Sequence, residues 1–208
     1  MKRVFLAGFV GGVLLFSWGS LSHMAIGLGN TGVQQLPQEQ PVLAALQANI
    51  PNAGFYFFPG MGAPPAANAT PKQRTAAMKE FEQKYQRGPY GILIYHPNGT
   101  NPRSPRQLLI EFVLDLVEVM ILAIIVSQAK GLTGFHTRVG LVVLVGILAA
   151  ITTNVEYWNW YGFPGDYTFG FVFDKVVGFL IAGIAIAAVL KKTTPQPQPA
   201  EDKALKPA

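Results

Sequence analysis

Four apolar stretches, each close to the length of a membrane span, constrain this chain more than any other feature of its sequence. A helix needs about 20 mostly apolar residues to cross the hydrocarbon core of a bilayer. The stretches cover residues 4–26, 108–129, 140–158 and 169–190. Only 13% of the 208 residues are charged, whereas about 25% is usual in soluble domains. The sequence therefore predicts an all-α membrane protein built as a four-transmembrane-helix bundle.

The chain divides around these stretches into four regions. Residues 1–26 form the first transmembrane helix, 27–107 an extracytoplasmic loop, 108–190 the second to fourth helices, and 191–208 a cytoplasmic tail. The loop is polar and rich in Pro and Gly. The tail alternates Pro with Gln, Lys and Ala and has little apolar surface to bury, so we predict that it is disordered.

Short periodic segments within the loop predict a small α/β cap between the first and second helices. The segment 41–50 has helical periodicity. Thr70 and the proline after it fit the N-cap and first position of a second helix over 71–87. Without a single cysteine, a cap of this size needs support from the bundle or the lipid surface. Two runs have the aromatic and β-branched content of strands, namely 55–58 and 90–95.

Basic residues near the ends of the helices predict the orientation of the chain. Cytoplasmic loops of membrane proteins carry an excess of Lys and Arg. Six such residues on one side against two on the other predict that both termini are cytoplasmic, because the two exceptions lie in a long loop, where charge has little influence. The short chain and the missing cysteines favour a bacterial-type inner membrane. The six are Lys2, Arg3, Lys130, Arg138, Lys191 and Lys192, and the two are Arg103 and Arg106.

The first helix has an alternative interpretation as a cleaved signal peptide. Its basic start and the small residues Ser20 and Ser22, at a possible cleavage site, fit that interpretation. Its apolar run is longer than the ~7 to 15 residues of a signal-peptide core, and Gly8 and Gly12 have the spacing of a helix-packing motif. We therefore favour an uncleaved signal anchor that packs into the bundle. The same spacing of small residues recurs at Gly146 and Ala150 and at Gly178 and Ala182.

Three carboxyl groups on the second helix, Glu111, Asp115 and Glu118, are the centre of the candidate functional site. At about 100° per residue their spacing places them within an arc of roughly 60°. An Asp at the centre of a membrane helix costs about 2.5 to 3.5 kcal/mol, whereas each Leu or Val returns only ~0.3 to 0.6 kcal/mol. The row must therefore face the bundle, where its members are paired, protonated or hydrated.

Other polar residues are expected near this row in the outer half of the bundle. Lys175 on the fourth helix should lie near the depth of Asp115, and a buried lysine there needs a carboxylate partner. The remaining members of the predicted polar cluster are Asp174, Asn154, Glu156 and His23.

Three hypotheses compete for this cluster. It can be an internal polar network that fixes helix packing, or a proton or cation path that binds a small polar solute from outside. The third is a metal site made of His23 with Glu111 or Asp115. The metal hypothesis is the weakest of the three, because the chain lacks the Glu-x-x-His spacing of helical metal sites.

At the level of function, the leading hypothesis is a non-enzymatic accessory or assembly protein whose cap or tail contacts a membrane-protein partner or a second copy. The alternative is a small proton- or cation-linked carrier or sensor that uses the carboxylates. We expect no cofactor, because no Gly-rich phosphate loop or Gly-x-Ser-x-Gly elbow is present. The basic residues are scattered, so the expected partner is the lipid bilayer and not nucleic acid.

Overall fold

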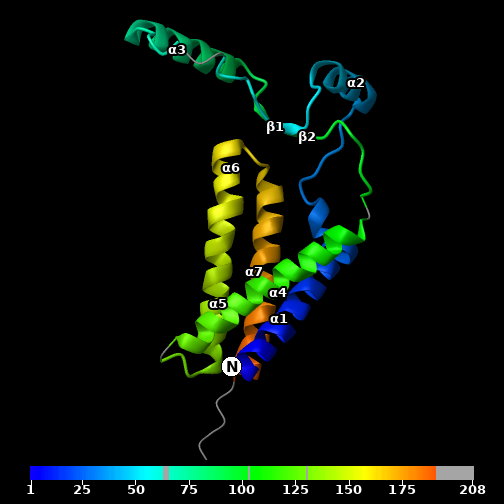
Figure 1. The fold of residues 1–208 in the computed structure, drawn as a ribbon, viewed down its shortest axis with the longest axis vertical. Helices are drawn as coiled ribbons and strands as arrows, with labels where there is room; N and C mark the ends of the chain where they lie inside the picture. Colours follow the sequence, from blue (N-terminus) through cyan, green and yellow to red (C-terminus); the bar gives the residue numbers. More distant parts are fainter. Residues whose placement is uncertain (63–65, 103, 130, 191–208) are drawn as a thin grey trace, which may run out of the picture.

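The computed structural model describes residues 1–62, 66–102, 104–129 and 131–190, and most of these residues are helical (Figure 1). The helices are α1 (Lys2–Ser20), α2 (Glu39–Asn49), α3 (Pro71–Arg87), α4 (Pro105–Gln128), α5 (Phe135–Ala150), α6 (Glu156–Tyr161) and α7 (Gly165–Val189), and the strands are β1 (Gly54–Phe58) and β2 (Gly91–Tyr95). The predicted disordered tail and four residues used for the orientation lie outside the described residues: 191–208, Arg103, Lys130, Lys191 and Lys192.

Two π-helical segments extend the helices of the bundle. The segment η1 (Leu21–Ile26) continues α1, and η3 (Ile151–Val155) joins α5 to α6. In η3 the Thr153 hydroxyl donates to the Ala149 carbonyl at 2.7 Å, and such bonds to the preceding turn compete with the regular helical ladder. A single-turn 3-10 segment, η2 (Leu28–Asn30), then connects η1 to the loop.

Three helices in the described residues are long and apolar enough to cross a membrane. They cover Lys2–Ile26, Phe135–Tyr161 and Gly165–Val189, with 25, 27 and 25 residues. The remaining predicted span, α4, has 24 residues and is about 36 Å long at ~1.5 Å per residue. Its three carboxyl groups make it too polar for the same assignment, so its crossing of the bilayer stays a prediction.

The long helices pack as two pairs joined by a third contact. α1 lies along α4, α5 lies along α7, and α1 also contacts α7 (Figure 1). A Cβ added to Gly12 would lie 2.8 Å from the Cα atom of Leu116, and one added to Gly146 would lie 2.6 Å from the Phe179 Cβ atom. Small residues thus let the helices approach closely, as their spacing in the sequence predicts. Val119 and Ile186 are fully buried at the centre.

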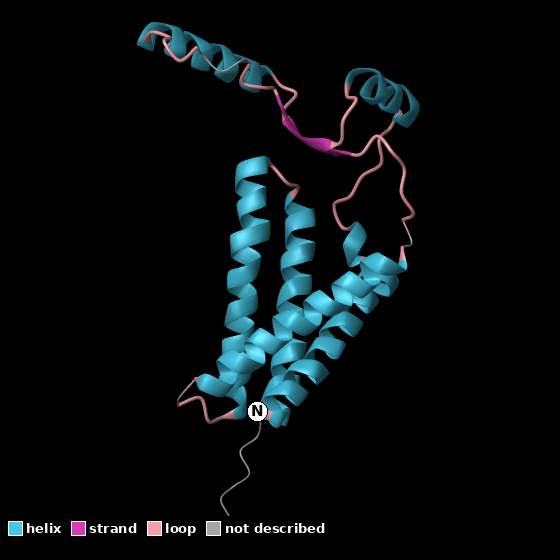
Figure 2. Cartoon of the chain, in the orientation of Figure 1, coloured by secondary structure: helices cyan, strands magenta, loops and turns pink. Residues whose placement is uncertain are grey.

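The segment between α1 and α4 forms the two helices and two strands predicted for the cap (Figure 2). β1 and β2 pair antiparallel, with Gly54 opposite Tyr95. α3 begins at the predicted residue, because the Thr70 hydroxyl accepts from the backbone N–H of Gln73 at 3.3 Å. The Gln73 side chain accepts in turn from the Thr70 N–H at 2.8 Å, which completes a capping box. The location of this cap outside the membrane stays a prediction.

Aromatic rings connect the cap internally and to the bundle. Phe57 of β1 stacks on Tyr85 of α3 with ring centroids 6.3 Å apart, and Tyr85 stacks on Tyr90 at 4.7 Å. Phe55 meets Tyr161, at the end of α6, edge to face at 6.5 Å. Through this ring pair, β1 contacts the end of the helical bundle that carries α6.

Candidate functional site

A cavity of about 390 Å³ lies between α1, α4 and α7, toward the end of α1 that leads into the cap. This volume falls within the range of small-molecule sites, about 300 to 1,000 Å³. Its wall combines apolar and aromatic side chains with charged ones. It is lined by Leu15, Phe16, Trp18, Gly19 and Ser20 of α1, His23 and Met24 of η1, Leu108, Glu111 and Asp115 of α4, and Asp174 and Lys175 of α7.

Five of the eight residues predicted for the polar cluster line this cavity, and three do not. Glu118 is one turn farther along α4, half-buried and outside the lining. Asn154 is half-buried in η3, where its side-chain oxygen accepts from the Thr153 hydroxyl at 3.0 Å. Glu156 is exposed at the start of α6. Asn154 and Glu156 lie away from this cavity because the segment that carries them follows α5, which packs mainly on α7 and contacts α4 only slightly.

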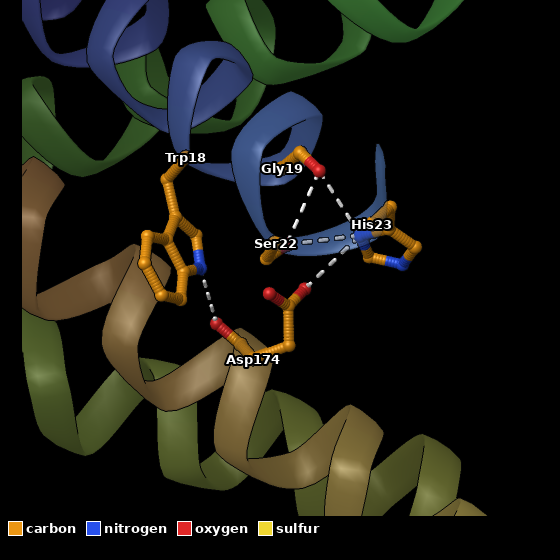
Figure 3. Close-up of polar contacts among 5 residues, drawn as sticks. All are labelled: Trp18, Gly19, Ser22, His23 and Asp174. Carbon is orange, nitrogen blue, oxygen red and sulfur yellow. Dashed lines mark hydrogen bonds and ion pairs between the residues drawn. The ribbon is translucent and has the colours of Figure 1, made fainter. Parts of the chain in front are cut away.

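His23 is held by backbone and side-chain oxygens around one ring nitrogen (Figure 3). Its Nδ1 atom lies 3.0 Å from the Ser22 hydroxyl, 3.1 Å from the Gly19 carbonyl and 4.0 Å from Asp174 Oδ2. Ser22 and Asp174 therefore lie beside the same ring nitrogen of His23. A Ser-His-Asp catalytic triad needs them on opposite ring nitrogens, so this arrangement fixes the ring but does not activate the serine.

Neighbouring groups clamp the imidazole and join η1 to α7. The ring of Phe171 meets it edge to face at 5.9 Å. A Cβ on Gly29 would lie 2.6 Å from the ring, so only glycine permits that approach. Trp18 of α1 adds a second link to α7, because its indole N–H donates to the Asp174 backbone carbonyl at 3.2 Å (Figure 3). These contacts hold in place the part of the cavity wall that is formed by α1, η1 and α7.

Lys175 does not form the ion pair expected from its depth in the bundle. The ion pairs among the described residues join His23 to Asp174 and Lys84 to Glu80. The Lys175 ammonium instead lies 5.8 Å from the ring centroid of Phe179, within the range of a cation–π contact. Because the residue is only half-buried, its charge keeps some contact with solvent, which lowers the need for a carboxylate partner.

The cavity contains more acidic than basic side chains. Glu111, Asp115 and Asp174 contribute three carboxyl groups, and Lys175 contributes one ammonium group. Asp174 Oδ1 is hidden from solvent and has no hydrogen-bond partner within the part of the chain that the structure describes. An excess of carboxylate in a cleft with low-dielectric walls attracts cations.

The proposed metal ligands His23, Glu111 and Asp115 line the same cavity, but among the described residues they do not form a group that could hold a metal ion. No group of three or more His, Cys, Asp or Glu side chains with metal-binding geometry occurs in residues 1–62, 66–102, 104–129 and 131–190. The ion-pair contact of His23 is with Asp174, not with Glu111 or Asp115, which leaves the metal hypothesis without support from the geometry.

Sequence reasoning missed Trp18 and Ser22, which fix the wall of the site. The available signal was local, because Ser20, Ser22 and His23 gather polar groups at the end of an apolar helix. Such residues bond to carbonyls of the preceding turn and favour π-helical segments, which often occur at functional sites.

Fold and site together define a helical protein with membrane-length helices and an acidic cavity at one end of its bundle. Comparisons of the chain with protein-family models, with curated proteins and with solved structures find no match.

Proposed function

We propose that this protein is a four-span membrane protein that acts as a small proton- or cation-linked carrier or sensor. In this proposal α4 is the fourth span, the cap is extracytoplasmic, both termini are cytoplasmic, and the membrane is of the bacterial inner type. The acidic cavity between α1, α4 and α7 is the observation that carries the proposal. A small solute with a positive charge enters it from outside.

The distribution of side chains around α4 supports its role as a span. Glu111 and Asp115 line the cavity, whereas Leu109 is 62% exposed and Val117 is 50% exposed on the protein surface. In water such a row of exposed apolar side chains is unfavourable, and in a bilayer it contacts acyl chains. Carboxyl groups that face a hydrated cavity avoid most of the cost of burial in lipid.

An unpaired acceptor on Asp174 supports a binding site in preference to an internal polar network. A network that serves only as structural glue is expected to satisfy its own members, because a buried polar atom without a partner costs about 1 to 3 kcal/mol. Asp174 Oδ1 is buried and has no hydrogen-bond partner among the described residues. The carboxyl group of Asp174 thus adds to the negative charge beside the cavity.

The size and the walls of the cavity favour an organic solute over a bare ion. A volume of about 390 Å³ exceeds that of several water molecules at about 30 Å³ each. Phe16 and Trp18 add aromatic surface beside the carboxyl groups, and aromatic faces attract cations. The best-fitting class is therefore a small organic cation, with the carboxylates as its counter-charges.

The absence of natural cysteines allows a direct test of the cavity. Ser20 lines it, so the variant Ser20→Cys places one thiol inside. In reconstituted vesicles of known orientation, this thiol is treated from outside with membrane-impermeant thiosulfonate reagents, one cationic and one anionic. We expect the cationic reagent to react faster by about tenfold or more, because focused fields in clefts raise association rates by about 10 to 10³.

Two matched variants make the labelling test decisive. Adding Asp115→Asn to Ser20→Cys should bring the two rates closer together, because it removes one carboxylate from the cavity. Asn159→Cys, on exposed α6, should show no comparable preference for the cationic reagent. Equal rates of both reagents at Ser20→Cys, or labelling of that thiol only from the opposite side, would contradict the proposal.

An accessory or assembly role is the second candidate, and the cap supplies the observation that favours it. Phe55 is 60% exposed and Ile94, its partner across the strands, is 66% exposed. A partner protein could cover this apolar pair. Purification from native membranes in mild detergent tests the role, since an accessory protein should copurify with one partner in a fixed ratio. A single species of monomer or homo-oligomer would speak against it. Loss of a proton- or cation-linked activity in the variant Glu118→Gln would also speak against the accessory role.

A further inference from the structure

Arg138 is an unusual buried charge at the end of the bundle opposite the cap. It is 7% exposed, near the N-terminus of α5. Its Nε atom donates to the Leu132 carbonyl at 2.9 Å, and its Nη1 atom donates to the Leu190 carbonyl at 2.6 Å. Both acceptors are backbone oxygens, one in the α4–α5 connection and one just after α7.

Both bonds go to neutral carbonyl groups, and among the described residues the guanidinium charge has no anionic partner. A guanidinium group has five N–H donors, so donors remain after the two described bonds. The described ion pairs do not include Arg138. Carbonyl dipoles stabilise a buried cation, but a full counter-charge is the stronger partner in a low-dielectric environment.

A second cavity, of about 360 Å³, adjoins this arginine. Its lining residues include Arg138 and three residues that carry a hydroxyl or amide group, Ser127, Gln128 and Thr133. These groups lie where α4 ends and α5 begins, and α5 has no acidic residue in its first turn. The end of α4 carries a partial negative charge and the start of α5 a partial positive one, so these two oppose each other and the guanidinium supplies the positive charge of the cavity. Among the described lining residues, the cavity thus combines one full positive charge with neutral polar side chains.

We propose that this second cavity is an anion site in which Arg138 binds a phosphate group. A planar guanidinium matches the paired oxygens of phosphate, and the neutral polar side chains complete the hydrogen bonding. The phosphate can belong to the headgroup of an anionic lipid, since the site lies at an end of the long helices, or to a soluble phosphate compound. The site shares no residue with the acidic cavity and does not depend on the function proposed for it.

The test uses the full-length protein purified in detergent and two probes. Native mass spectrometry measures retention of phosphatidylglycerol against the zwitterionic phosphatidylcholine. Thermal unfolding measures the effect of inorganic phosphate against chloride at equal ionic strength. We expect preferential retention of phosphatidylglycerol, a higher melting temperature in phosphate, or both. Lipid retention alone identifies a headgroup site, and a phosphate effect alone identifies a soluble ligand.

Variants separate the site from general charge and from folding. Arg138→Gln should weaken binding at least about tenfold, because it removes a charge-assisted contact, whereas Lys2→Gln, an exposed change at the same end, should not. Thr133→Glu keeps Arg138 and its two bonds but places a carboxylate in the cavity, and Thr133→Gln is its neutral control. Equal anion binding by these two Thr133 variants, or no anion effect in the unmodified protein, would overturn the proposal.

Discussion

The bundle and the cap are held together in different ways, although both belong to one chain. The bundle buries residues of four long helices, with Val119, Val142 and Ile186 fully covered. In the cap, Tyr95 is the one hydrophobic residue that is buried among those described. The cap instead relies on strand pairing, a capping box and stacked aromatic rings. The cap is therefore expected to unfold locally, whereas the helices of the bundle should unfold together.

The difference follows from the solvent that each region is expected to meet. Helices in lipid gain little from burying apolar side chains against one another, so close contact of small residues decides their association. A small segment in water needs a sizeable apolar core or external support. The contact between Phe55 and Tyr161 gives the cap such support from the bundle.

The largest expected effect is loss of the bundle when a packing glycine is enlarged. Gly12→Leu would bring a side chain to within 2.8 Å of the Leu116 Cα atom, which the facing helix can relieve only by moving away. Overpacking of this kind costs about 1 to 3 kcal/mol and occasionally more. Unfolding by a denaturing detergent, followed by circular dichroism, measures the change.

A matched glycine controls for the change in residue type. Gly140 on α5 has no atom within 4 Å of an added Cβ, so Gly140→Leu should leave the unfolding midpoint nearly unchanged. If both variants unfold at the same point as the unmodified protein, small-residue packing does not hold the bundle.

A smaller and local effect is expected from the cap of α3. Thr70→Ala removes the hydroxyl that accepts from the Gln73 N–H, and loss of such a cap costs about 0.5 to 2 kcal/mol. Amide hydrogen exchange should speed up in α3 and stay unchanged in α5 and α7. Faster exchange in those bundle helices would show that the two regions unfold together, contrary to the comparison above.

The smallest expected effect concerns one exposed ion pair on α3. Lys84 lies 2.7 Å from Glu80, and its hydrogen bond and charge lower the pKa of Glu80 from the usual 4.5. The pair therefore stabilises the folded protein when the pH is above the usual pKa of Glu80. This contribution is lost as the pH falls through the lowered pKa. Lys84→Met should raise the pKa of Glu80 toward its usual value. Carboxyl chemical shifts measured by NMR follow the titration.

The control for this titration is Lys72→Met, eight residues from Glu80. It should leave the pKa of Glu80 as it is in the unmodified protein. A pKa of Glu80 that does not respond to Lys84→Met would mean that the pair is screened completely in solution.

Local signals in the sequence were sufficient to predict the helices and strands of both regions. Thr70 with the proline after it located the start of α3, since a cap depends only on residues within one turn. The strands and α2 were predicted to within about two residues of their observed ends. The long apolar runs likewise predicted the four long helices, with ends that differ by up to five residues because hydropathy does not mark where a helix stops in polar surroundings.

The site was predicted less completely, because it depends on which helices are neighbours. The row on α4 suggested Glu111 and Asp115, and both line the cavity. Depth along the helices also suggested Asn154 and Glu156, but α5 packs beside α7, so neither residue joins the cavity. The predicted depth of a residue in the membrane gives its position along the helix axis, but it does not show which neighbouring helix the residue faces.

By itself, the sequence determined the helical segments, the carboxylate row and the small-residue spacing, because each depends on the period of one helix. Only the tertiary structure decided that His23 contacts Asp174 and that Lys175 contacts Phe179. It also decided that Arg138 lies beside a cavity with backbone partners. These outcomes depend on the rotation and pairing of whole helices, which are set by the sum of many weak packing contacts.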